Sequence, residues 1–150
     1  LNTIRFDAAA GVTVDWLRCA AVVGARRYQG SLYVALDEHK TEAVVALRSA
    51  AGAEPQGEPI YLQHSRWRVY DCELGTPLTT CLAQGYGNGE MTWQGQPHRR
   101  YAVHLGRDSA GQEITQVRAD EHGMFEFSLP RSAPGGVRFS LIAVVDGRGP

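Results

Sequence analysis

The sequence has no long apolar run and no excess of charge of either sign. None of its apolar runs approaches the roughly 20 residues that a membrane-spanning helix needs, so membrane insertion is not expected. The 150 residues carry 15 Lys and Arg against 16 Asp and Glu, a formal net charge of −1. This balance provides no basic field to attract nucleic acid, so no nucleic-acid partner is expected.

The beginning of the sequence lacks the charged-then-apolar order of a secretory signal. It starts at Leu1 rather than Met, and a leucine in second position does not normally permit removal of Met. We therefore expect a processed or partial chain, from which a signal or a neighbouring domain can be missing.

Motifs for catalysis and metal binding are also scarce. The five histidines form neither His-x-His nor His-Glu-x-x-His, and the three cysteines form no Cys-x-x-Cys. Ser109 lacks the Gly-x-Ser-x-Gly elbow and is interpreted as a turn residue. The acidic pairs Asp37-Glu38 and Asp120-Glu121 also lie in predicted turns. We predict no catalytic residue, no metal site and no cofactor, and hence a protein that is not an enzyme.

The cysteine count leaves two interpretations open. Cys72 and Cys81 are close enough in sequence to bridge a hairpin around residues 75–77, whereas Cys19 has no nearby partner. Alternatively, all three are small buried apolar residues.

What the sequence does contain is apolar residues with period two, the pattern of half-buried strands. In the first third, this pattern predicts strands at residues 3–7, 12–16 and 32–36. Residues 41–51 fit either a helical stripe or a strand, and a strand is favoured. The Gly- and Pro-containing residues 51–59 are the best candidate linker. We predict that residues 1–57 are an N-terminal β segment or small subdomain, either separate or completing the sheet of the second part.

The second part, residues 58–150, contains about seven predicted strands separated by short turns. The Asn88-Gly89 pair predicts a hairpin turn, because a type I′ turn needs positive φ at both central residues. No helical crossover separates the strands, so an all-β fold is expected, an antiparallel β-sandwich with at most one short helix. The predicted strands lie at residues 60–71, 77–84, 90–94, 99–106, 113–119, 125–129 and 137–145.

One stretch resembles a known kind of domain. Residues 113–129, Glu-Ile-Thr-Gln-Val-Arg-Ala-Asp-Glu-His-Gly-Met-Phe-Glu-Phe-Ser-Leu, are similar to the hairpin of bacterial and phage immunoglobulin-like and carboxypeptidase-regulatory-like (transthyretin-type) domains. In these, a strand runs into Asp-x-x-Gly, an aromatic strand follows, and a later strand, here residues 137–145, closes the sandwich. The resemblance covers about residues 99–146 and implies a spacer, adhesive or decorating role on cell surfaces or phage particles.

The best candidate ligand site is a small aromatic platform for carbohydrate. Tyr86 lies in the glycine-rich residues 85–89, and Trp93 follows on the next predicted strand. Glu90 and Gln94 could supply hydrogen bonds to a sugar. The competing interpretation is that Trp93 belongs to the core and that Tyr86 caps the turn.

These observations predict a non-catalytic structural or interaction module of a larger extracellular or virion assembly, acting as a decoration, spacer or attachment domain. Its expected partners are other protein subunits in an oligomer, because edge strands invite pairing with other chains. The alternative is a carbohydrate-binding or host-attachment module with glycan ligands. A small hydrolase is the third hypothesis.

Overall fold

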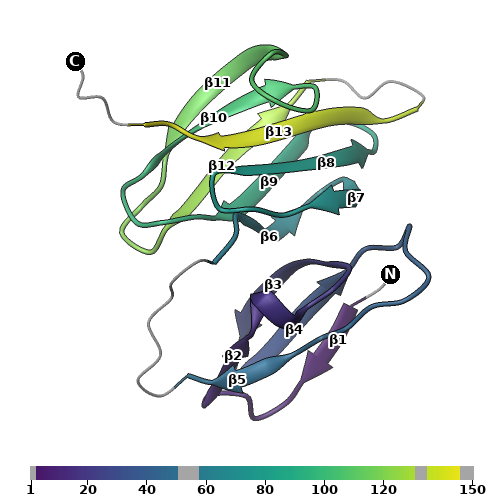
Figure 1. Cartoon of the computed structure of the whole chain (residues 1–150), viewed down its shortest axis with the longest axis vertical. Helices are drawn as coiled ribbons and strands as arrows, with labels where there is room; N and C mark the ends of the chain where they lie inside the picture. The colour runs from purple at the N-terminus through teal and green to yellow at the C-terminus, as the bar shows by residue number, and fades with distance from the viewer. Residues whose placement is uncertain (1–2, 51–57, 131–134, 146–150) are drawn as a thin grey trace.

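The computed structural model describes residues 3–50, 58–130 and 135–145, which form two β lobes stacked along the long axis of the molecule (Figure 1). The prediction of an all-β fold is confirmed. The N-terminal lobe contains β1 (Thr3–Phe6), β2 (Val12–Val14), β3 (Val22–Tyr28), β4 (Ser31–Leu36) and β5 (Leu47–Ser49). The C-terminal lobe contains β6 (Tyr61–Ser65), β7 (Arg68–Glu73), β8 (Leu78–Gln84), β9 (Gly89–Gln94), β10 (Arg100–Leu105), β11 (Gln112–Arg118), β12 (Met124–Leu129) and β13 (Val137–Ala143). A 3-10 turn at Trp16–Arg18 is the one helical element of the described residues, and none of these residues forms a helix fit to cross a membrane.

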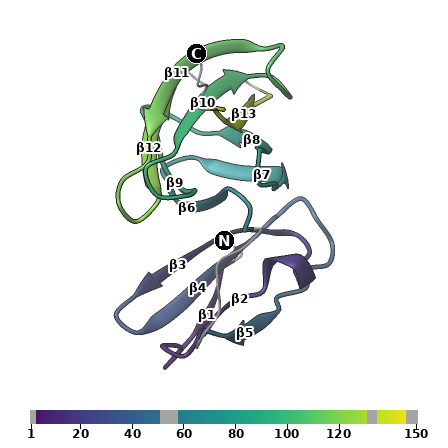
Figure 2. The ribbon, with the colours of Figure 1, turned by 60° about the vertical axis from the view of Figure 1, so that its left-hand side comes forward.

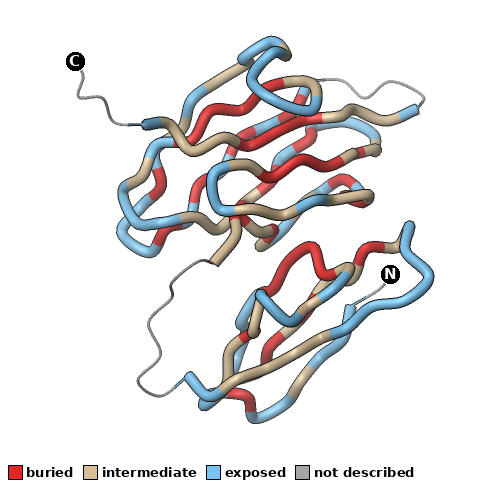
Figure 3. The backbone as a smooth tube through the Cα atoms, in the orientation of Figure 1, coloured by how far each residue is buried: buried red, intermediate tan, exposed pale blue. Residues whose placement is uncertain are grey.

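The C-terminal lobe is a sandwich of two sheets. A five-stranded sheet in the order β11-β10-β13-β8-β7 faces the strands β6, β9 and β12. Buried residues alternate with less buried ones along β9 and β12, whereas the central strands β10, β13 and β8 have runs of successive buried residues; Figure 3 shows the buried segments in both sheets. Its largest fully buried side chains include Trp93, Tyr101, Phe139 and Leu141.

The N-terminal lobe packs β1, β4 and β3 against the two-stranded ribbon of β2 and β5. Its core is small, and the buried side chains of this core are all valine, alanine or leucine: Ala9, Val14, Val22, Ala25, Leu32 and Val34. The favoured strand within residues 41–51 is confirmed over the three residues of β5.

One sheet runs through both lobes, in the order β1-β4-β3-β6-β9-β12. The lobes join where β3 pairs with β6, in parallel, through the single registered pair Gly24 and Leu62. A Cβ atom at Gly24 would lie 2.1 Å from the Leu62 carbonyl oxygen, so only glycine permits this approach. Residues 51–57, the centre of the predicted linker, lie outside the described residues.

Strand β3 has no counterpart among the strands predicted from sequence. Its register shifts between Val22 and Gly24, and this bulge breaks the period-two pattern. As a result two successive valines are both buried: Val22 packs in the core of the N-terminal lobe and Val23 in that of the C-terminal lobe. A strand that serves two cores does not show alternation.

The single strand predicted over residues 60–71 is wrong, because the structure has two strands there, β6 and β7, in different sheets. The break lies at Arg66 and Trp67. Ser65 Oγ donates a hydrogen bond to the Trp67 carbonyl (2.7 Å) and accepts one from the Trp67 amide (3.1 Å). This local turn moves the chain from one sheet to the other.

Two predicted hairpins are also wrong. The Asn88-Gly89 pair does not join paired strands, because β8 pairs with β7 and β13 whereas β9 pairs with β6 and β12. The Asp-x-x-Gly turn likewise connects β11 and β12, which lie in opposite sheets; the two views of Figures 1 and 2 show both strands. Both connections are arches across the sandwich. The predicted closing strand β13 lies within the five-stranded sheet, between β10 and β8.

Candidate functional site at the junction of the lobes

The structure separates the four residues of the predicted saccharide platform. Tyr86 is 99% exposed, whereas Trp93 is 0% exposed because it points inward from β9 into the core. Glu90 is exposed and Gln94 is half-buried, with its amide oxygen accepting a hydrogen bond from Gln63 (3.0 Å). The prediction of one exposed platform is therefore wrong, because inner and outer residues of β9 alternate.

The glycines around Tyr86 serve Trp67 instead of a ligand. A Cβ atom at Gly85 would lie 2.4 Å from the Trp67 ring, and one at Gly89 would lie 2.9 Å from it. Trp67 Nε1 donates a hydrogen bond to the Tyr86 carbonyl (3.1 Å). Residues 85–89 therefore wrap closely around the indole, which explains the glycine spacing that had predicted a hairpin.

The candidate nucleophile Ser109 lies in an exposed turn. Asp108 Oδ1 accepts a hydrogen bond from the Ala110 amide (2.8 Å), and the Asp108 carbonyl accepts one from the Gly111 amide (3.1 Å). These contacts confirm the interpretation of Ser109 as a turn residue.

A row of Ser140, His104 and Glu113 crosses three neighbouring strands, β13, β10 and β11. The order of side chains is that of a hydrolase triad, but the geometry is not. Ser140 is 0% exposed and donates its proton to the Gly106 carbonyl (2.6 Å). His104 Nδ1 lies 2.9 Å from the Gly111 carbonyl and Nε2 lies 3.5 Å from Glu113. A serine that is buried and already bonded cannot reach a substrate.

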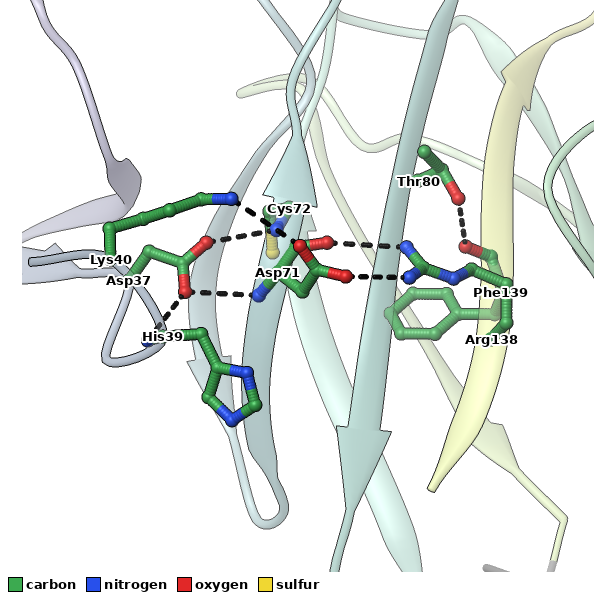
Figure 4. Close-up of polar contacts among 8 residues, drawn as sticks. All are labelled: Asp37, His39, Lys40, Asp71, Cys72, Thr80, Arg138 and Phe139. Atoms are coloured by element: carbon green, nitrogen blue, oxygen red, sulfur yellow. Dashed lines mark hydrogen bonds and ion pairs between the residues drawn. The ribbon is translucent and has the colours of Figure 1, made fainter. Parts of the chain in front are cut away.

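A densely hydrogen-bonded polar group lies where the lobes meet (Figure 4). Asp37, just after β4, is only 4% exposed, yet its carboxylate has three backbone partners. It accepts hydrogen bonds from the amides of His39 (3.0 Å), Asp71 (3.0 Å) and Cys72 (2.9 Å). The last two amides belong to β7, so one carboxylate ties the N-terminal lobe to the C-terminal sandwich. We call this group the interlobe latch.

A bulge in β7 presents these amides to the latch. The register of β7 against β8 shifts between Tyr70 and Glu73, and Asp71 has φ of +51°. Arg138 holds the bulge from the other side, because its Nη2 lies 2.8 Å from Asp71 Oδ2 and its Nη1 donates to the Asp71 carbonyl (3.2 Å). Lys40 Nζ lies 3.4 Å from the other Asp71 oxygen.

Further contacts surround the latch on its exposed side. Glu38 pairs with Arg68, and the His39 ring lies 4.2 Å from the Tyr70 ring, centroid to centroid. The Arg68 guanidinium lies 5.2 Å from the centre of the same tyrosine ring. The sequence predicts only a charged turn at residues 37–40, because sequence does not distinguish a buried aspartate from a solvated one.

The Asp71 carboxylate predicts a pH-dependent contribution to stability. Its pKa lies below the ordinary 3.8, chiefly because Arg138 donates a hydrogen bond to it and also because Lys40 is near. A carboxylate with a lowered folded-state pKa stabilises the fold above about pH 4. This stabilisation is lost as the pH falls through the folded-state pKa. We expect Asp71→Asn to be less stable than wild type at pH 7, by a gap that narrows as the pH is lowered to about 2. Urea unfolding at both pH values measures the gap.

Glu73→Gln, an exposed change on the same strand, is the control and should leave stability unchanged at both pH values. A gap for Asp71→Asn that does not change with pH would contradict this role for Asp71.

All three cysteines are free thiols in this structure, so the considered Cys72–Cys81 bridge is not formed. Cys81 is fully buried, and this burial, together with a hydrogen bond that its thiol donates to the neighbouring Cys72, raises its pKa. Burial raises the pKa of Cys19 as well. The thiolate is the form that attacks substrates and binds metals, so neither site favours that chemistry. The described residues contain no group of three or more His, Cys, Asp or Glu able to hold a metal ion.

Beside the latch, a groove of about 470 Å³ lies between the lobes. Its walls come from β3 and β4 on one side and from β6 and β7 on the other, with the buried Trp67 also in its lining. We call it the interlobe groove; its polar and aromatic lining includes Arg26, Tyr28, Tyr33, Gln63, His64 and Ser65.

Comparison with known proteins gives no relative: no protein-family model, no curated protein and no solved structure matches this chain.

Proposed function

We propose that this chain is a non-catalytic structural and interaction module of a larger extracellular or virion assembly, in which it contacts other protein subunits through the β1 edge of its six-stranded sheet. The observation that supports this is the state of strand β1. This edge strand pairs on one side only, with β4, in a register without bulges. Three of its four residues are exposed, including Ile4, which is 38% exposed.

The edges of the five-stranded sheet are closed to further pairing or interrupted, whereas β12, the opposite edge of the six-stranded sheet, pairs with β9 in an unbroken register. In β7 the amides of Asp71 and Cys72 already donate to Asp37. In β11 the register against β10 shifts between Val103 and His104, and such bulges hinder the addition of a strand. The edge at β1 lacks both devices, and a regular exposed edge is the usual site for an added strand from another chain.

The proposal also includes the kind of domain, a β-sandwich of the immunoglobulin-like or transthyretin-like type, and its place in an extracellular or virion assembly. An immunoglobulin-like or transthyretin-like sandwich is supported by the two facing sheets of the C-terminal lobe. Such modules commonly present surfaces, and the buried serine of the Ser140–His104–Glu113 row offers no support for the hydrolase alternative. The division into residues 1–57 and 58–150 is supported by the two core clusters, although the shared sheet joins them.

The test is the effect of a charged edge on association. We expect the full chain to form a defined oligomer, or to associate with increasing concentration, and Ile4→Lys to abolish this association while the fold is kept. Light scattering coupled to size-exclusion chromatography measures it, with circular dichroism as the check on folding. Gln116→Lys, on the edge strand β11, is the matched control and should associate like wild type. A chain that is monomeric at every concentration would contradict the oligomeric form of the proposal.

A further inference from the structure

The interlobe groove has the size and composition of a small-ligand site. Its volume of about 470 Å³ falls within the range of such pockets, and its lining combines apolar and aromatic side chains with a few polar groups. Because both lobes supply its walls, it exists only in the assembled two-lobe fold. It adjoins the β1 edge that carries the proposed function, because Thr3 of β1 is part of its lining, but Ile4 is not.

Two tyrosines on the N-terminal side give the groove aromatic surface. Tyr28 is 51% exposed, and Tyr33 is half-buried on the neighbouring strand β4. Tyr33 is the cross-strand partner of Arg26, so the two side chains share one face of the sheet. A partly exposed tyrosine ring can stack on the C–H face of a sugar ring while its hydroxyl remains free for a hydrogen bond.

The charge in the groove is not balanced. The Arg26 guanidinium lies 5.6 Å from the centre of the Tyr28 ring, and it has no hydrogen bond or ion pair to any described residue. The neighbouring Arg27, by contrast, donates to the Ala9 carbonyl (2.9 Å). The other charged pair in the lining, Glu38 and Arg68, is mutually neutralised.

His64, across the groove on β6, is exposed, and its imidazole also has no hydrogen bond or ion pair to a described residue. The groove therefore contains two side-chain groups without a polar partner in the described part of the chain, the guanidinium of Arg26 and the imidazole of His64. A guanidinium presents parallel N–H donors that match the two oxygens of a carboxylate.

From these features we infer that the interlobe groove binds a carboxylate-bearing saccharide, a uronic-acid oligomer, with a sugar ring stacked on Tyr28 and Tyr33 and its carboxylate paired with Arg26. Gln63 and Ser65 supply further hydrogen-bonding groups on the opposite wall. A neutral sugar would leave Arg26 without an anionic partner, so the groove discriminates by charge.

Isothermal titration calorimetry of the full chain tests this inference, with a hexamer of galacturonic acid as the ligand and a hexamer of glucose as its neutral counterpart. We expect the acidic oligomer to bind at least about tenfold more tightly, and its affinity to fall as salt is raised. Arg26→Gln and Tyr28→Ala, both at exposed positions, should each weaken binding about tenfold.

The controls change the same residue types elsewhere on the surface. Tyr86→Ala removes the most exposed tyrosine and Arg107→Gln an exposed arginine in the β10–β11 turn, and both should bind like wild type. Absence of binding by the acidic oligomer, equal affinity for the neutral one, or binding unaffected by Arg26→Gln and Tyr28→Ala would overturn the inference. Circular dichroism of each variant shows whether a loss reflects unfolding, and the association state of the Ile4→Lys variant tests the proposed function separately.

Discussion

Replacing Asp37 by alanine is expected to destabilise the protein by about 3 kcal/mol or more and to loosen the junction of the lobes. The carboxylate accepts three backbone hydrogen bonds while only 4% exposed. Alanine would leave the amides of Asp71 and Cys72 without an acceptor, and a buried donor without a partner carries a large desolvation cost. Asn, with one acceptor oxygen, should fall between alanine and wild type.

Urea unfolding measures the loss of stability, and hydrogen exchange shows where it acts. The amides of Asp71 and Cys72 should exchange much faster in Asp37→Ala, whereas those of the sandwich core, such as Phe139, should keep their protection if the lobes open before the core does. Glu38→Gln is the matched control. It removes the neighbouring carboxylate, whose pairing with Arg68 is exposed to solvent, and should change stability little. Equal effects of the two substitutions would show that the latch does not join the lobes.

Placing alanine at Gly24 is expected to cost about 3 kcal/mol and to weaken the pairing of β3 with β6. The added Cβ would lie 2.1 Å from the Leu62 carbonyl oxygen and 2.8 Å from the Leu62 Cβ. The obstructing oxygen belongs to the backbone, so no side-chain rotation relieves the contact. Since this is the single registered pair between the lobes, the strands must move apart.

Thermal or urea unfolding, with small-angle X-ray scattering to follow the spread of the lobes, measures this effect. Gly11→Ala is the control, because a Cβ at Gly11 meets nothing within 4 Å and its φ is not in the left-handed region. We expect the Gly11 variant to match wild type, or to be slightly more stable through the unfolded chain. A Gly24→Ala protein with wild-type stability and dimensions would mean that the lobes are joined by the latch alone.

Much of the strand content was predictable from alternation. In β12 the buried residues Phe125, Phe127 and Leu129 alternate with exposed ones, as the sequence predicts. This alternation is visible in the sequence because β12 contributes side chains to one core only. Strand β3 was missed because its two valines serve different cores, and residues 60–71 were interpreted as one strand because Trp67 continues the apolar pattern through a turn.

The candidate site was much less predictable. Of the four predicted platform residues, Trp93 is core and Tyr86 is an isolated exposed ring, whereas the groove uses Tyr28 and Tyr33 from a lobe where no ligand site was predicted. The glycines near Tyr86 gave a misleading signal, since glycine in a turn and glycine against an indole look the same in sequence. Nothing near Asp37 marks it as buried.

The sequence by itself determined the all-β character of this protein and the inward face of most of its strands, because alternation is set by residues that are neighbours along the chain. The tertiary structure decided which strands pair, where the lobes join and which polar groups converge. Those features depend on contacts between distant residues: Asp37 and Cys72 are 35 positions apart, and Arg138 and Asp71 are 67. Local patterning carries no information about which of several similar strands lies beside another, so the latch and the groove arise only when the whole sheet has formed.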